Sequence, residues 1–148
     1  MPPRSVRAPR RRSWGSFPTT ADEGIWARGD STDHLFEALG LGLFALMTDL
    51  RTVRRVSERA VHASGEDVTS LAVSFLSELL LLQQTEGFLA RDLTVRTLGL
   101  PPTSLVASVA GEPFDEERHP ARKEVKAITL HRATVDLARG SARVIVDI

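Results

Sequence analysis

The stretch VTSLAVSFLSELLLLQQTEG, residues 68–87, carries the clearest structural pattern in this chain of 148 residues. Apolar side chains recur in it at intervals of three and four, at Val68, Leu71, Ala72, Phe75, Leu76, Leu79 and Leu80. This spacing predicts an amphipathic helix over 67–86. Gly65-Glu66-Asp67 provides a cap before the helix, and Gly87 ends it.

A second helical pattern lies closer to the N-terminus. Leu35, Leu39, Leu43 and Leu46 follow the capping residues Asp30-Ser31-Thr32, which predicts a helix over 32–49. Before it, Gly24–Gly29 has the composition of a short strand, and a weaker strand pattern follows within 51–64.

After Gly87 the hydrophobic period changes from helical to alternating. Four strands are predicted, over 88–98, 104–110, 125–137 and 142–148, with Gly- and Pro-containing turns between them. Helices followed by consecutive strands indicate an α+β fold, with two helices packed on one face of a largely antiparallel sheet. We expect the core to centre on Leu39, Leu43, Leu46, Leu71, Phe75, Leu76 and Leu79.

The charges are unevenly distributed along the chain. Lys and Arg number 19, as do Asp and Glu, but residues 1–16 hold five arginines and no acid. Residues 17–148 therefore carry a net charge of −5. We expect 1–16 to be a disordered, Arg-rich leader and 17–148 to be a single domain, too acidic for a globally basic nucleic-acid binder.

Several classes of protein are excluded or disfavoured by the sequence. No Cys is present, so disulfide frameworks and thiolate metal sites are absent. The longest apolar stretches are too short or too polar to span a bilayer, and Arg10-Arg11-Arg12 lacks the apolar run of a twin-arginine signal. We expect a cytoplasmic protein with no membrane partner. The Gly40–Ala45 stretch matches a dinucleotide-binding fingerprint only in letters, because it lies inside a predicted helix.

Two acidic residues lie where the ends of the chain could meet. Asp22 precedes the first strand of the predicted domain, and Asp147 adjoins the terminal carboxylate of Ile148. If the last strand lies beside the first, these groups converge with no nitrogen or sulfur ligand. Such hard oxygen donors suit a divalent metal ion, and Ca²⁺, Mg²⁺ and Mn²⁺ are all open at this point.

Short motifs in a fixed order cover residues 17–148. They are Thr20-Ala21-Asp22-x-Gly24-Ile25, then Gly42-Leu43-Phe44-x-Leu46-Met47-Thr48-Asp49, Glu78-Leu79-Leu80 and Thr85-Glu86-Gly87, and later Gly111-Glu112-Pro113-x-Asp115-x-x-Arg118-His119, Glu124-Val125-Lys126-Ala127-Ile128-Thr129-x-His131 and Val144–Ile148. In this order the chain resembles the archease family. It departs from the family pattern at Thr19, where His is usual, and at Leu130, where an aromatic residue is common.

The resemblance implies an accessory protein rather than a stand-alone enzyme. Archease-like proteins assist the GTP-dependent ligase that joins RNA 3′-phosphate or 2′,3′-cyclic phosphate ends to 5′-hydroxyl ends, in tRNA splicing or RNA repair. They promote guanylylation of the ligase's histidine and thereby multiple turnover, and RNA contact is expected mainly through the ligase. The family's metal site maps to Asp22, Asp147 and the carboxylate of Ile148.

Three more residues lie in the stretches that match the family well. Arg118, His119 and Lys126 are candidates for contact with the ligase or a nucleotide phosphate. Two alternatives remain open at this point. One is a small metal-dependent phosphoesterase that uses Asp22 and Asp147, with His119 or His131 as the base. The other is a chaperone or adaptor without a metal.

Overall fold

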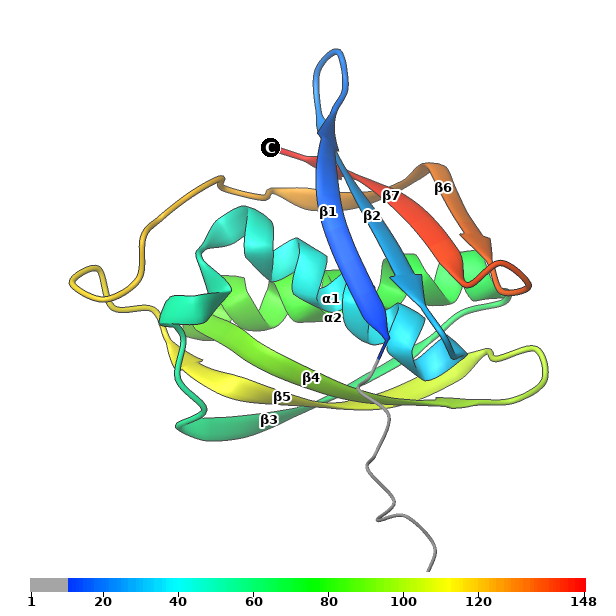
Figure 1. Ribbon diagram of the computed structural model, residues 1–148, viewed down its shortest axis with the longest axis horizontal. Coiled ribbons are helices and arrows are strands. Elements are labelled where there is room, and N and C mark those ends of the chain that lie inside the picture. The colour runs from blue at the N-terminus through cyan, green and yellow to red at the C-terminus, as the bar shows by residue number, and fades with distance from the viewer. Residues whose placement is uncertain (1–10) are drawn as a thin grey trace, which may run out of the picture.

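The computed structural model describes residues 11–148, in which two helices lie between two antiparallel sheets (Figure 1). The helices are α1 (Thr32–Met47) and α2 (Val68–Glu86), with a short 3₁₀ turn at Leu50–Thr52 after α1. The four-stranded sheet has the order β1-β2-β7-β6, with strands Arg12–Pro18, Glu23–Gly29, Ser141–Asp147 and Ala127–Asp136. The three-stranded sheet has the order β3-β5-β4, with strands Ser57–Ser64, Ser104–Pro113 and Phe88–Leu98.

The α+β class with two helices and antiparallel strands is confirmed, but the strands form two sheets where one was expected. Helix α1 contacts β1 and β2 on one side and β4 on the other, and α2 contacts β6 and β3. Each sheet therefore has the helices on one of its faces. Hairpin turns pair β4 with β5 and β6 with β7. The partners β2–β7 and β3–β5 are distant in sequence, so hydrophobic alternation alone does not identify them.

The core lies where the sequence pattern places it. Of the seven predicted core residues, Leu46 is 7% exposed and the other six are fully buried. Asp67 caps α2 by accepting a hydrogen bond from Ser70 N at 2.7 Å, and Gly87 ends the helix with φ = +66°, a conformation that glycine adopts without strain.

The glycine-rich part of α1 serves packing. A Cβ at Gly40 would lie 2.2 Å from Leu93 Cδ1 of β4, and one at Gly42 would lie 2.7 Å from Ile25 Cγ2 of β2. These two glycines let the helix approach both sheets closely. The letters of the dinucleotide fingerprint therefore have a structural explanation in the interior of a helix.

The predicted disorder of residues 1–16 is wrong for residues 12–16, which belong to β1. This strand pairs with β2 along its whole length, from Arg12↔Gly29 to Pro18↔Glu23. Trp14 packs against the core, and the Arg12 guanidinium binds the carboxylates of Glu37 on α1 and Asp92 on β4. The composition favours a solvated leader because ion pairing and the packing of one partly buried indole are not visible in it. Residues 1–10 of that prediction lie outside the described part of the chain.

Smaller boundary differences concern the strands predicted over 51–64, 104–110 and 125–137. The first begins only at Ser57, the second continues to Pro113, and the third is shorter, at Ala127–Asp136. Over residues 11–148, neither helix combines the length and the apolar character needed to cross a bilayer.

Candidate metal centre and the loop beside it

The register of β2 and β7 brings Asp22 and Asp147 to the same end of the four-stranded sheet. Glu23 pairs with Val146, and Asp22 and Asp147 are the next residues beyond that pair. In Figure 1 the C-terminus lies beside the base of the β1–β2 hairpin. The sequence-based condition for convergence, that the last strand lies beside the first strand of the predicted domain, is met.

Local hydrogen bonds hold both residues in place. Asp22 N donates to Thr19 Oγ1 at 3.0 Å, and Thr19 N donates to the Asp22 carbonyl at 3.2 Å, which closes the turn at the hairpin tip. The Asp147 carbonyl accepts from Lys126 N at 2.7 Å. The side chain of Ile148 packs against the core, which anchors the last residue.

The carboxylates of Asp22 and Asp147 are available to a ligand. Within residues 11–148 neither forms an ion pair, and Asp147 is exposed. No three His, Asp or Glu side chains in this part of the chain form a metal-binding group. The carboxylate of Ile148 stays the expected third anionic donor at this site. The donors are all oxygens, which fits a hard divalent cation.

A further acidic residue, Glu23, lies beside this end of the sheet and was not singled out from the sequence. Its side chain is buried, and Oε1 lies 3.1 Å from Lys123 Nζ. Lys123 is held in turn by its backbone N, which donates to the Leu46 carbonyl at 2.9 Å. Glu23 begins a strand in which every second residue from it faces the core. This alternation was the sign in the sequence that the Glu23 side chain is buried.

The loop between β5 and β6 is fixed by a buried carboxylate, Glu112. Its Oε2 accepts from Arg54 N at 2.7 Å, Arg118 Nη2 at 2.8 Å and His119 Nε2 at 3.1 Å. Burial by itself would raise the pKa of Glu112. The hydrogen bonds from Arg54, His119 and Arg118 outweigh that effect and lower the pKa to about 2.

His119 has a structural role in this loop. Its side chain is fully buried, and Nδ1 accepts a hydrogen bond from Asp115 N at 2.9 Å. Nδ1 is thus an acceptor, so the ring proton is on Nε2, where it is donated to Glu112. The prediction that His119 contacts a ligase or a nucleotide is contradicted by this burial.

The other two predicted contact residues lie in different surroundings. Arg118 is one-third exposed and belongs to the Glu112 cluster, where its Nε is buried without a hydrogen-bond partner. Lys126 is exposed, and its backbone bond to Asp147 places it beside the candidate metal centre. Of the three, only Lys126 is brought to that end of the sheet.

Known proteins resemble this chain over most of its length. The sequence model of the Archease protein family (MTH1598/TM1083) matches residues 14–148. The chain belongs to the archease family. Protein archease of Pyrococcus furiosus is 36% identical over 141 residues, covering 93% of this chain and 99% of that protein. Protein archease of Thermococcus gammatolerans is 39% identical over 129 residues, covering 84% and 89%.

The fold agrees with a solved structure as well. The solution structure of Methanobacterium thermoautotrophicum protein 1598 matches with a TM-score of 0.78 and 34% identity, over 92% of this chain and 99% of that one. Thr19, a position at which the sequence analysis expects a departure from the family pattern, has a defined role in this chain. Its hydroxyl accepts the Asp22 amide and so supports the candidate ligand.

Proposed function

We propose that this archease-family protein is an accessory activator of a GTP-dependent RNA ligase, and that it acts through a divalent cation held by Asp22, Asp147 and the carboxylate of Ile148. The proposal assigns the catalytic step to the ligase, and it places both proteins in the cytoplasm. Ca²⁺ is the favoured ion, with Mg²⁺ or Mn²⁺ as alternatives. The observation that carries the proposal is the β2–β7 register, which sets Asp22 next to Asp147.

The chemistry of guanylylation explains why a divalent metal site would help an activator of the ligase. Transfer of a nucleotidyl group to a ligase histidine develops charge on the α-phosphoryl group and on the leaving pyrophosphate. A divalent cation supplies positive charge against these groups. Within residues 11–148, Asp22 and Asp147 form no ion pair, while Lys123 pairs with the nearby Glu23. Lys126 is exposed, has no ion pair among residues 11–148, and is joined through its backbone N to the Asp147 carbonyl, so its side chain could reach a phosphate at the same end of the sheet.

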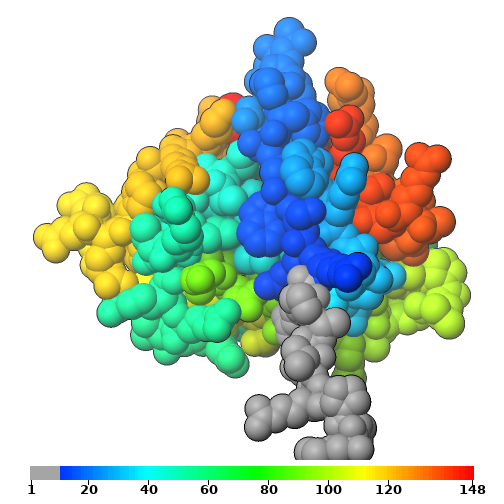
Figure 2. All heavy atoms as spheres, viewed as in Figure 1, coloured from blue at the N-terminus to red at the C-terminus, as the bar shows by residue number. Residues whose placement is uncertain are grey.

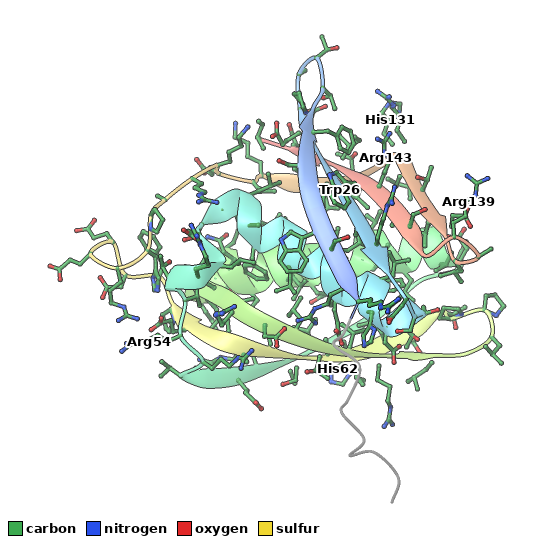
Figure 3. All side chains as sticks on the ribbon, viewed as in Figure 1. Trp26, Arg54, His62, His131, Arg139 and Arg143 are labelled. Carbon is green, nitrogen blue, oxygen red and sulfur yellow. The ribbon has the colours of Figure 1, made fainter. Side chains whose placement is uncertain are left out.

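The phosphoesterase alternative finds less support. It needs a base beside the two aspartates, but both ring nitrogens of His119 are engaged in a buried cluster. Ala127 pairs with Asp147, so His131 lies four residues farther along β6. Figure 3 draws His131 over β6, away from the C-terminus. These positions favour an accessory role over hydrolysis.

The test is guanylylation of the cognate ligase, present in limiting amount, with and without this protein. We expect stimulation by the parent protein, and its loss in Asp22→Ala and Asp147→Ala, because each removes one of few anionic donors. Glu58→Ala, an exposed carboxylate on β3, is the matched control and should behave as the parent. A short extension after Ile148 should also abolish stimulation, whereas one before Met1 should not.

The outcomes separate the parts of the proposal. Normal stimulation by both aspartate variants would refute the metal site while leaving the accessory role in place. No stimulation by the parent protein would refute the accessory role itself.

A further inference from the structure

The outer face of the four-stranded sheet, which turns away from the helices, carries an aromatic ring in an unusual setting. A Cβ at Gly15 of β1 would lie 2.5–2.6 Å from three atoms of the Trp26 indole. The indole therefore lies across the backbone of the neighbouring strand, in the space that any side chain at position 15 would fill. Trp26 is only partly buried, so part of the ring is open to solvent.

The ring of Phe17 on β1 is arranged in the same way, against Gly24 of β2 on the same face of the sheet. Its ring lies where a Cβ at Gly24 would be, 2.1–2.5 Å from three ring atoms. The Arg143 guanidinium covers the Phe17 ring at 4.6 Å from its centroid. In contrast to Phe17, no cation covers Trp26 among the described residues.

A hollow of about 440 Å³ opens beside Trp26 over β2, β7 and β6. Its lining includes Trp26, Arg28, Arg143 and Asp136. Figure 3 places Trp26 and Arg143 over this sheet together with Arg139, while His62 lies on the other sheet. In the space-filling view the β1–β2 hairpin projects beside β6 and β7 (Figure 2). The volume falls in the range of small-ligand pockets and suits a single nucleotide.

The charge of this hollow is positive and uncompensated. Within residues 11–148, Arg28 and Arg143 have no acidic partner, although most other arginines of this part of the chain do. The one acid in the lining, Asp136, already pairs with Arg139 at 3.7 Å. A hollow of similar size over β3 and α2 has Glu78 in its lining and no arginine.

We propose that this face binds single-stranded RNA, with a base stacked on Trp26 and its flanking phosphates at Arg28 and Arg143. Every base has a π-face that an exposed indole can stack against, and guanidinium groups pair with phosphates. A protein partner would not need two unpaired arginines beside a flat ring in a nucleotide-sized hollow. The site is distinct from the metal centre but shares its face, because Arg143 and Asp147 lie four residues apart on β7, about 13 Å.

This inference gives the protein its own RNA contact and does not depend on activation of a ligase. Its test is the fluorescence anisotropy of a short fluorescein-labelled oligouridine, titrated with the full chain alone at several salt concentrations. We expect Trp26→Ala to raise Kd about 5- to 150-fold and Trp26→Phe to retain most of the affinity. Arg28→Ala and Arg143→Ala should each reduce the slope of log K against log salt by about 0.7.

Arg96→Ala is the matched control, because Arg96 is exposed on β4 of the other sheet and has no acidic partner among the described residues. It should change neither Kd nor the slope. The same oligouridine in a duplex should not respond to Trp26→Ala, since its bases are already stacked. With only two tryptophans in the chain, Trp14→Phe leaves Trp26 as the sole indole reporter, whose emission oligouridine should quench.

Unchanged affinity and salt slope in Trp26→Ala, Arg28→Ala and Arg143→Ala would overturn the proposal. So would an equal loss in Arg96→Ala, which would indicate attraction by net charge alone. If Trp26→Ala weakens stimulation of the ligase but not RNA binding, the face is a protein-docking surface and the RNA site is refuted. Should Trp26→Ala fail to fold by circular dichroism, the two arginine variants decide.

Discussion

The carboxylate of Glu112 and the carboxylates of Asp22 and Asp147 lie in opposite surroundings. Glu112 is buried, and its oxygens accept hydrogen bonds from two arginines, a histidine and a backbone amide. Asp22 and Asp147 have no cationic partner within residues 11–148, and the residues around them are fixed by backbone contacts. A carboxylate whose hydrogen-bonding capacity is filled stabilises the fold, and one left open is free for a ligand. The difference predicts which variants unfold the protein and which only disable it.

The largest expected effect on stability is at Glu112. Glu112→Ala removes the shared acceptor of Arg54, Arg118 and His119 and leaves buried donors unpaired. We expect a loss of about 3 kcal/mol or more in the free energy of unfolding, measured by urea denaturation. A loss below about 1 kcal/mol would mean that the loop between β5 and β6 is held by its other contacts.

The second effect is the stabilisation of the protein by Ca²⁺ bound at Asp22 and Asp147. Ca²⁺ at about 100 times its Kd should stabilise the parent protein by about 2.7 kcal/mol, because it binds only the folded state. Asp22→Ala and Asp147→Ala should show no such gain, while Glu58→Ala should keep it. Thermal unfolding with and without Ca²⁺ measures this. An equal gain in all three variants would place the ion elsewhere.

A third effect is the response to acid. The pKa of Glu112 is about 2 in the folded protein and near 4.5 when unfolded, so the unfolded state binds the extra proton between these values. Stability from this group is present above pH 4.5 and is lost as the pH falls toward 2, with a slope of up to about 1.4 kcal/mol per pH unit. Urea titrations at several pH values should give a shallower slope for Glu112→Gln than for the parent. Identical slopes would contradict the assigned hydrogen bonds.

The smallest expected effect is the change in stability of the two aspartate variants in the absence of metal. Without divalent metal, Asp22→Ala and Asp147→Ala should each change the free energy of unfolding by less than about 0.5 kcal/mol, because neither removes an ion pair. Circular dichroism and urea denaturation in chelator are sufficient to measure it. Destabilisation comparable to that of Glu112→Ala would show that these carboxylates are structural after all.

The sequence predicts the elements of this fold better than their arrangement. Both helices and the strand over 88–98 follow from periodicity, because burial of one face imposes a repeat on the residues that share it. Division into two sheets depends on pairings between distant strands, and no local pattern encodes them. Strand β1 was missed because its order depends on Arg12 meeting Glu37 and Asp92, residues far along the chain.

The candidate sites divide in the same way. Asp22 and Asp147 were identified from their positions near strand ends and from the family resemblance, and their binding of a metal remains a prediction. Glu112, Arg118 and His119 lie in one of the family motifs, but Arg54 lies far from it in the sequence, so no single motif reveals the cluster. His119 was misassigned because a histidine in a well-matched stretch gives no sign of whether it is buried. The Trp26 face was also not identified from the sequence. The indole lies over a glycine of the neighbouring strand, and the sequence alone does not show which residues face each other across two strands.

The strand order β1-β2-β7-β6 also bears on how the molecule is assembled. At the centre of this sheet, β2 pairs with β7, so β2 stays without this partner until the much later strand β7 has been synthesised. The β4–β5 hairpin depends on neighbouring residues and can form while the chain is still growing. Asp22, directly before β2, comes to lie beside Asp147 only when β7 pairs with β2. A chain in which Asp22 lies beside Asp147 has therefore paired β2 with β7, and a partner that recognises both residues would distinguish such chains from those in which the sheet has not formed.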